Sequence, residues 1–253
     1  SDPETVRVDG TGHVTGVKTG TATVTAYELV GGRKFSTDPV SFMVTEGEAQ
    51  NPVSEKILSR ALTVKNPSDG GYSVSGDSVT IKAMGQGLWA TQTANNVIVS
   101  GENANRGDGT FTAIVKMSGK TVNNWDEAGL FIYKDNDNYV AVQRKHGNGT
   151  PKIHVVTETN KTPDENQNTS DSAETDIWLK LVKSGDTFTG YYSTDKADWK
   201  QVGNSITNST IGNSFGVALI AGTGNNTKGT PFTFSDLEIN GEKIALTEDA
   251  PTG

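Results

Sequence analysis

Aromatic and planar polar side chains are the residues of this sequence whose types suit ligand binding. Aromatic rings can stack on the apolar face of a ligand such as a sugar, while amide and guanidinium groups can bind its hydroxyls. Trp89, in "GQGLWATQ", and Trp125, in "TVNNWDEAG", lie beside loop-forming residues. These two rings are therefore the better candidates for platforms that contact a ligand, with packing inside the protein as the alternative for each.

The stretch "NYVAVQR" supplies further candidate ligand contacts. Its two valines share one face of a strand, which leaves Tyr139 and Gln143 on the opposite face. Arg144 ends the stretch and could bind two hydroxyls or a carboxylate, although pairing with a neighbouring strand is the alternative. His154 is also a candidate for ligand contact, and a half-exposed strand position without a role is its alternative.

The acidic stretch "YKDNDNY" could hold a cation or form a turn. Asp135 to Asn138 offer oxygens at close spacing, but Asp and Asn also tolerate the left-handed conformations that turns need. The stretch lacks the Gly and the final Glu of an EF-hand loop. Because strand-like runs flank it on both sides, we expect a hairpin turn.

Residues for catalysis are sparse. A Glu-x-Asp-x-Glu run would aim three carboxylates into one groove, and neither such a run nor a "GxSxG" motif occurs. The "ETD" of Glu174 to Asp176 lacks a third carboxylate, and the three histidines have no metal-ligand spacing. Cysteine is absent, which excludes thiolate nucleophiles, disulfides and Cys-ligated zinc. We expect no enzyme activity in this chain.

The composition excludes further classes. The formal net charge of −8 argues against a nucleic-acid groove or an anionic membrane surface, because both attract clustered Lys and Arg. No apolar run reaches the roughly 18 residues that a membrane span needs. Hydrophobic residues make up 33% and glycines number 29, which together favour a globular protein of short strands and many turns.

The elements that must position the candidate residues are therefore strands. From residue 55 onward, short runs such as "SVTIKA" and "TFTAIVKM" alternate apolar and polar residues between turn signals, which predicts a β-sandwich or jelly roll. Only "VSEKILSRAL" has helical spacing. The polar residues 157–176 predict a long loop, which could flank a ligand groove. In "FTFSDLEI" the apolar phase shifts at Asp236, which predicts a bulge.

Residues 1–46 resemble the second half of a bacterial immunoglobulin-like domain of group 2. The string from Val8 to Ala26 fits that family's pattern V-D-x-x-G-x-V-T-x-V-K-x-G-T-A-T-V-T-A. Alternation predicts strands at residues 5–9, 13–18, 21–27 and 40–45. The strands that open the family's fold have no counterpart before Ser1, so we expect a partial immunoglobulin-like sandwich here. Residues 47–54 are polar and predict a linker.

Residues 55–246 resemble a concanavalin A-like, or laminin G-like, sandwich. The matching motifs are "GYSVSGDSVTIKA", "LWATQTANNVIV", "AGLFIYKDNDNYVAVQR" and "IWLKLVKSGDTFTGYYSTDKADWKQVG", within Leu58 to Ile239. Trp178 and Trp199 lie in the last motif and are expected to pack structurally. The fold class expected for the chain is thus all-β, a partial immunoglobulin-like sandwich followed by a concanavalin A-like jelly roll, with residues 247–253 as a tail.

The second resemblance implies a function. Domains of this kind are appended to secreted glycoside hydrolases such as β-xylosidases and arabinofuranosidases, as carbohydrate-binding or accessory modules. It implies a non-catalytic module of a secreted or cell-surface bacterial protein. Its partners would be a polysaccharide or other glycan and a catalytic domain of the same parent chain, with no nucleic acid and no membrane insertion. The alternative is a structural domain that packs against a catalytic domain or surface partner and has no sugar site.

A calcium ion is a further expectation from the resemblance. Jelly-roll sugar-binding modules often tie their first and last strands together with calcium. Asp236, together with Asp69 or Asp77 near the opening strands, is the candidate metal site. An Asp at a strand irregularity, without a metal, is the alternative.

Overall fold

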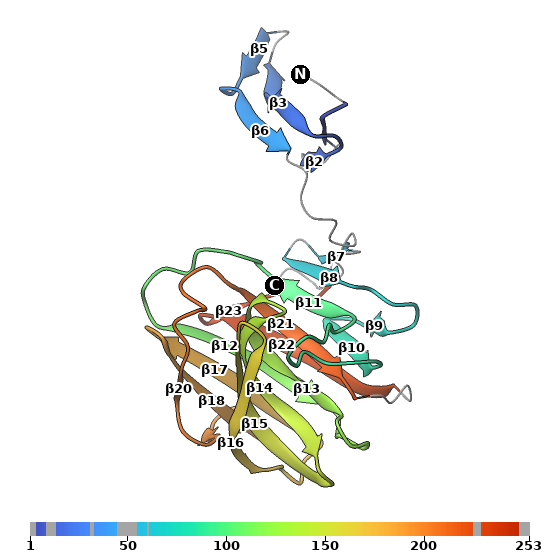
Figure 1. The fold of residues 1–253 in the computed structure, drawn as a ribbon, viewed down its shortest axis with the longest axis vertical. Helices are drawn as coiled ribbons and strands as arrows, with labels where there is room; N and C mark the ends of the chain where they lie inside the picture. Colours follow the sequence, from blue (N-terminus) through green and yellow to red (C-terminus); the bar gives the residue numbers. More distant parts are fainter. Residues whose placement is uncertain are drawn as a thin grey trace. The chain divides into compact units, whose positions relative to one another are not determined.

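The computed structural model is composed of strands and turns, in two compact units, Ser1–Val53 and Ser54–Gly253 (Figure 1). It describes residues 4–8, 14–30, 33–44, 55–59, 61–224 and 229–247. The fold is all-β, and the described residues include no helix, so none of them forms a helix able to cross a membrane. The predicted linker, residues 47–54, and residues 248–253 of the predicted tail lie outside the described residues.

The smaller unit contains three antiparallel pairs of strands. They are β1 (Val6–Val8) with β2 (Val14–Gly16), β3 (Gly20–Val24) with β6 (Val40–Val44), and β4 (Tyr27–Val30) with β5 (Arg33–Ser36). The sequence predicts strands at the positions of β1, β2, β3 and β6, but not at β4 or β5. Val6 and Ala22 are buried hydrophobic residues of this unit. The immunoglobulin-like sandwich itself stays a prediction.

The larger unit is a jelly-roll sandwich of two antiparallel sheets, as the sequence predicts. The first, the β12 sheet, runs in the order β19-β18-β17-β12-β22-β10-β9, with β20 beside β18 and β23 beside β22. Its strands are β9 (Tyr72–Val74), β10 (Ser78–Ala83), β12 (Phe111–Ser118), β17 (Asp176–Ser184), β18 (Thr187–Ser193), β19 (Lys200–Gln201), β20 (Ile206–Thr207), β22 (Thr230–Ile239) and β23 (Glu242–Lys243).

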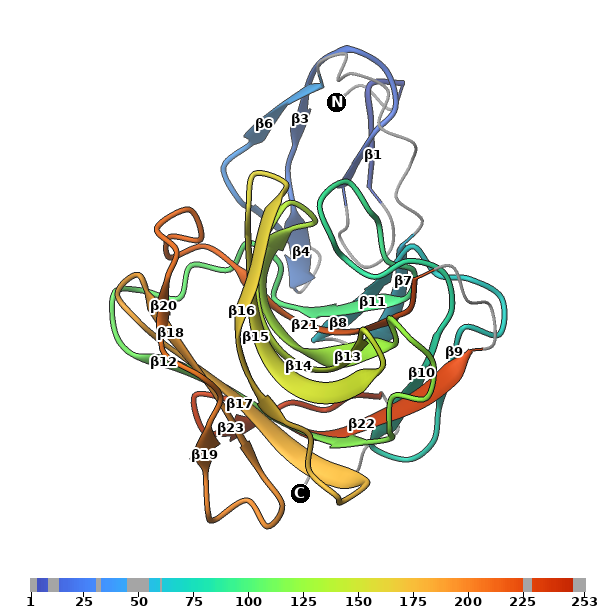
Figure 2. The same cartoon turned by 60° about the horizontal axis from the view of Figure 1, so that its bottom comes forward.

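The second sheet, the β14 sheet, runs in the order β16-β15-β14-β13-β21-β11-β8-β7. Figure 2 shows it as a strongly curved layer whose hollow face is directed away from the β12 sheet. Its strands are β7 (Glu55–Ser59), β8 (Leu62–Lys65), β11 (Val97–Ser100), β13 (Glu127–Asp135), β14 (Asn138–Gly147), β15 (Thr150–Thr159), β16 (Thr162–Ser170) and β21 (Gly216–Gly222).

The main core fills the space between the two sheets. Along β12 and β17 buried and partly exposed residues alternate, so that Val115 and Leu179 face the core while Lys116 and Trp178 face outward. Val140 and Val142 of β14 join this core from the other sheet. Burying each such aliphatic side chain contributes about 1.5–3 kcal/mol, so this core supplies most of the stabilisation.

A second, smaller core lies on the hollow face of the β14 sheet. Leu88 and Ala94, from the loop of residues 84–96, pack there against buried residues of five strands, which are Val97, Val99, Phe131, Tyr133, Tyr139, Ala141, Val156, Ala218 and Ile220. The loop covers one part of the hollow face.

Two local predictions are confirmed. A hairpin joins β13 to β14 through the acidic stretch, and Asp135 Oδ1 accepts the backbone N–H of Asp137 at 2.9 Å, as expected of a turn. At the end of β22 the pairing with β12 shifts, so that Asp236 and Leu237 oppose the single residue Val115. Asp236 adopts φ +50 there, which identifies the predicted bulge.

One sequence pattern is overridden by tertiary pairing, and one local prediction is wrong. The stretch "VSEKILSRAL" contains β7 and the start of β8 rather than a helix, because pairing at the edge of the β14 sheet overrides its helical spacing. Residues 157–176 are not a loop, since they contain β16, the edge strand beside β15. A two-residue turn joins these strands, and Asn160 and Lys161 both have positive φ. β16 has no apolar face that could reveal it in the sequence.

Candidate functional site

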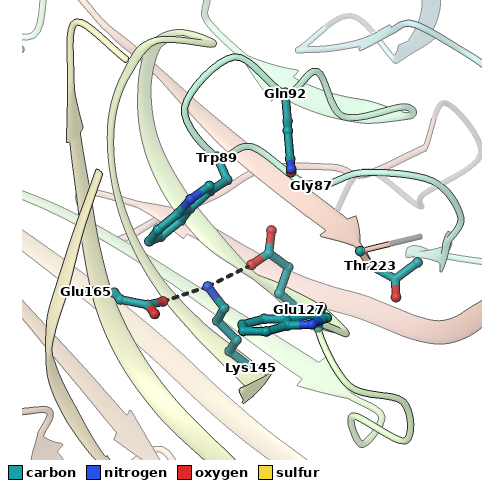
Figure 3. Close-up of a pocket in the computed structure, with 9 residues that line it drawn as sticks. Gly87, Trp89, Gln92, Glu127, Lys145, Glu165 and Thr223 are labelled. Carbon is teal, nitrogen blue, oxygen red and sulfur yellow. Dashed lines mark hydrogen bonds and ion pairs between the residues drawn. The ribbon is translucent and has the colours of Figure 1, made fainter. Parts of the chain in front are cut away.

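A pocket opens on the hollow face of the β14 sheet, beside the second core (Figure 3). Its volume is about 380 Å³, within the range of roughly 300–1,000 Å³ typical of small-molecule sites. Three strands and three loops supply its lining, which consists of Gly87, Trp89, Gln92, Trp125, Glu127, Lys145, Glu165, Thr223 and Gly224. The pocket thus contains both tryptophans that the sequence singled out as ligand platforms.

Trp125 is presented to solvent in a strained conformation. Its side chain is 42% exposed, and its backbone has φ +71, a region that bulky L-residues rarely occupy. The backbone N–H of Trp125 donates to the His146 carbonyl at 2.6 Å, and the N–H of His146 donates to the Asp126 carbonyl at 2.8 Å. Trp125 also packs against Gly224, where an added Cβ would come 3.1 Å from the Trp125 side chain.

The buried carboxylate of Asp126 fixes the loop that carries Trp125. Asp126 Oδ2 accepts the backbone N–H groups of Val122 at 3.0 Å and Asn123 at 2.8 Å, and the Thr230 hydroxyl at 2.7 Å. Asp126 itself is 1% exposed and does not line the pocket. Its role is therefore to hold the loop in the shape that sets Trp125 at the rim.

A second buried carboxylate holds the loop that carries Trp89. Glu158 Oε2 accepts the backbone N–H of Ala90 at 2.9 Å, and Ala90 has φ +57. The Tyr139 hydroxyl lies 3.1 Å from the same oxygen and 2.5 Å from the carbonyl oxygen of Leu88. Burial raises the pKa of the Glu158 carboxyl, against the lowering effect of the Ala90 and Tyr139 hydrogen bonds. Tyr139 therefore supports the Trp89 loop from below and is not part of the pocket lining.

Three charged side chains line the pocket together. The Lys145 ammonium lies between two carboxylates, 2.6 Å from Glu165 Oε2 and 3.7 Å from Glu127 Oε2 (Figure 3). It also lies 4.3 Å from the centroid of the Trp89 ring, a cation–π contact, and 5.8 Å from that of Trp125. Burial raises the pKa of the Glu127 carboxyl, and the nearby charge of Lys145 opposes that rise.

Gln143 and His154 lie beneath these charges rather than in the pocket lining. Gln143 Nε2 donates to Glu127 Oε2 at 3.2 Å. His154 Nδ1 lies 4.0 Å from Glu165 Oε2, and burial lowers the pKa of His154 to about 4, with the carboxylate of Glu165 opposing the shift. His154 is consequently neutral near pH 7. The predicted face of Tyr139 and Gln143 is correct, but both side chains support the site from inside.

Arg144 lies on the other face of β14 and cannot contact a ligand in the pocket. Its side chain is fully buried, and its Nε donates to Asp171 Oδ1 at 2.9 Å. The remaining guanidinium nitrogens donate to backbone carbonyl oxygens of Gly119, Glu174 and Thr175. Strand alternation explains this placement, because Arg144 follows Gln143 and therefore points to the side of Val140 and Val142. Arg144 ties loops together instead of binding sugar.

The candidate calcium ligands do not form a cation site as they are placed. Lys243 lies between two of them, with its Nζ 3.0 Å from Asp77 Oδ2 and 3.7 Å from Asp236 Oδ1. Asp77 Oδ1 accepts the backbone N–H of Leu246 at 2.9 Å, and Asp69 is exposed. Within the ranges that the structure describes, no group of three or more His, Asp or Glu side chains is placed to hold a metal ion. Calcium stays a prediction that this placement does not favour.

The other two tryptophans lie on the outward face of the β12 sheet. Lys116 Nζ lies 5.0 Å from the ring centroid of Trp178, and Lys180 Nζ lies 4.0 Å from that of Trp199. Both rings are partly buried under lysine side chains. They do not line the pocket, so they offer controls for experiments on it.

The sequence analysis did not identify the three charged residues of the pocket, Glu127, Lys145 and Glu165. The first two could have been identified from the sequence. The hairpin turn sets the β13–β14 register, in which Tyr133 is opposite Tyr139 and Glu127 is opposite Lys145. Lys145 also shares the strand face of Tyr139 and Gln143. Glu165 could not be found in this way, because β16 was interpreted as a loop.

A family model described as "Protein of unknown function (DUF1349)" matches residues 69–242. No curated protein matches the chain in sequence at a significant level. Among solved structures, a functionally unknown protein from Saccharomyces cerevisiae is similar with a TM-score of 0.54 and 19% identity, over 72% of this chain and 92% of that one.

Two Bacillus proteins have regions of the same fold. The GH43 BlXynB protein from Bacillus licheniformis is 17% identical with a TM-score of 0.62. The xylan beta-1,4-xylosidase from Bacillus halodurans C-125 is 12% identical with a TM-score of 0.57. Each match covers 90% of this chain and 44% of the other, so the chain spans less than half the length of either protein. At these identities the likeness shows the fold alone.

Proposed function

The chain belongs to the DUF1349 family of proteins of unknown function, and on this premise we propose that its larger unit binds a glycan in the pocket lined by Trp89 and Trp125. The module holds the sugar without cleaving it. In this proposal it belongs to a secreted or cell-surface bacterial protein that also carries a catalytic domain.

The observation that carries the proposal is the convergence of two loop-borne tryptophans on one open pocket with polar walls. Trp125 is 42% exposed and has a strained backbone at φ +71. The buried hydrogen bonds of Asp126 hold its loop in that conformation. A ring that served only packing would have no need of that conformation. Rings of this kind contact apolar sugar faces, and the carboxylates and the Gln92 amide can bind hydroxyls.

The charges in the pocket favour binding over glycoside hydrolysis. A hydrolytic pair of carboxylates must leave the scissile bond, and in inverting enzymes a water molecule, between its two members. Here the ammonium of Lys145 lies in that position, within 3.7 Å of Glu127 and 2.6 Å of Glu165. Both carboxylates are therefore engaged by an internal cation rather than directed at a glycosidic bond.

A binding module of this type would act by proximity. Tethering a catalytic domain to its polysaccharide converts a second encounter into an intramolecular one and raises the effective concentration of substrate. The partial match to Bacillus proteins named for GH43 and for a xylan xylosidase supports an attached hydrolase as the partner, and xylan as the first ligand to test.

The test is a glycan-array screen of the complete chain, followed by calorimetry on any ligand found. We compare wild type with Trp125→Ala and with Trp199→Ala, a matched tryptophan on the β12 sheet. Binding that is lost in Trp125→Ala and retained in Trp199→Ala supports the proposal. Absence of binding by the folded wild type, or equal loss in both variants, overturns it and favours the structural role. A parallel screen in EDTA tests the predicted calcium.

A further inference from the structure

Among the described residues that line the pocket, Lys145 is the one cation, and it is already paired within the protein. Lys145 has three N–H donors, and its ammonium has three partners around it, which are Glu165 Oε2 at 2.6 Å, Glu127 Oε2 at 3.7 Å and the face of the Trp89 ring at 4.3 Å. The Lys145 side chain is 6% exposed. Glu165 and Glu127 therefore lie between the Lys145 ammonium and a ligand in the pocket.

The charge that a ligand would meet is consequently negative or neutral. The residues lining the pocket include two carboxylates and a single ammonium. Glu165 is the more accessible carboxylate, with a side chain that is 33% exposed, against 10% for Glu127. His154 beside Glu165 adds no positive charge near pH 7, because burial lowers its pKa to about 4.

We propose, resting on the glycan-binding function above, that the pocket accepts uncharged sugar units and excludes acidic ones, and that Glu165 sets this selectivity by covering the Lys145 ammonium. A uronate or a sulfated sugar would place its anion beside two carboxylates, and the one ammonium among the described lining residues is already paired with them. A neutral sugar would instead donate hydroxyl hydrogens to those carboxylates, which favours it.

The position of Glu165 makes it suited to this role. It lies on the edge strand β16, whereas Lys145 lies two strands away on β14. An edge-strand side chain can be changed without disturbing the sheet on both sides. Lys152 on β15, directly opposite Lys145 in the ladder, does not line the pocket and provides a matched charged control.

The experiment uses the complete chain and matched probe pairs, in which a terminal glucose, galactose or xylose unit is compared with an acidic counterpart, glucuronate, galacturonate or a sulfated xylose. Wild type should bind a neutral member and not its acidic partner. Glu165→Gln should gain at least about tenfold in affinity for the acidic partner, because it frees Lys145, while neutral binding changes little. The gained binding should weaken as salt is raised.

Controls separate this inference from the function on which it rests. Lys152→Ala should leave the selectivity unchanged, and Glu165→Ala should reproduce the gain if Glu165→Gln folds poorly. Wild type that binds the acidic member as tightly as the neutral one overturns the selectivity but leaves glycan binding intact. The same holds if neither Glu165 variant gains acidic binding. Absence of any binding that depends on Trp125 overturns both.

Discussion

Replacing Asp126 by alanine should weaken ligand binding about as much as removing the Trp125 ring, although Asp126 lies outside the pocket. Its carboxylate accepts hydrogen bonds from Val122, Asn123 and Thr230 on one oxygen. The Asn123 side-chain amide also donates to this oxygen, at 3.3 Å. A hydrogen bond to a charged group contributes about 1.5–3 kcal/mol, so the four together exceed the roughly 1–3 kcal/mol that a left-handed bulky residue costs. Without them the balance reverses, and Trp125 should relax to negative φ.

The assay measures both consequences. Urea unfolding should show a loss of about 3 kcal/mol or more for Asp126→Ala, since two backbone N–H groups lose their buried acceptor. Calorimetry should show a weakened Kd close to that of Trp125→Ala. Thr230→Val, which removes one of the four hydrogen bonds to Asp126, should lower both the stability and the affinity by less. A folded Asp126→Ala protein that binds within about twofold of wild type would refute the reasoning.

The strain itself can be isolated with two substitutions at Trp125. At φ +71 the Cβ of alanine makes the left-handed backbone conformation unfavourable, whereas glycine has no Cβ and adopts it freely. Trp125→Gly should therefore be more stable than Trp125→Ala by about 1 kcal/mol, although glycine is usually the less stable of the two. Both variants lack the ring and should bind equally poorly. Equal stability, or a more stable alanine variant, would show that the conformation is not strained.

Arg144→Met should destabilise the protein by about 3–5 kcal/mol, measured by urea unfolding, because the carbonyl oxygens of Gly119, Glu174 and Thr175 lose their buried donor, and Asp171 loses its buried partner while retaining Lys120 at 3.2 Å. A loss below about 1 kcal/mol would contradict the role of Arg144 in tying loops. For His154, the lowered pKa of about 4 means that below about pH 6.5 the unfolded chain binds a proton that the folded protein lacks. The free energy of unfolding should therefore fall between pH 6.5 and 4, by about 2–3 kcal/mol more in wild type than in His154→Gln. A difference in stability between the two proteins that does not change with pH would contradict the lowered pKa of His154.

Alternation in the sequence was sufficient to predict the sandwich, because strands buried on one face, such as β12 and β17, show their period directly. It failed at β16, whose residues are polar on both faces. An edge strand that covers no core has no apolar signal, so only pairing with β15 reveals it. Glu165 was missed for that reason.

The sequence predicted which residues lie at or near the candidate site better than it predicted what each of them contacts there. Trp89 and Trp125 were correctly placed beside loops, and both line the pocket. The same alternation that put Tyr139 and Gln143 on one face excludes Arg144 from it. What the sequence could not show is that the loop of residues 84–96 covers Tyr139. Loop conformation depends on tertiary contacts, and the alternation of apolar and polar residues along a strand does not reveal such contacts.

The two tryptophans share one structural solution, and this favours a common purpose. Each ring belongs to a loop that is held in a left-handed conformation at or next to the ring, at Trp125 itself and at Ala90. Each loop is fixed by a buried carboxylate: Asp126 accepts two backbone N–H groups of one loop, and Glu158 accepts the backbone N–H of Ala90 in the other. Burying a carboxylate is costly unless hydrogen bonds compensate. Two independent loops that each carry a buried carboxylate beside the same pocket support the proposed preorganised binding site over packing alone.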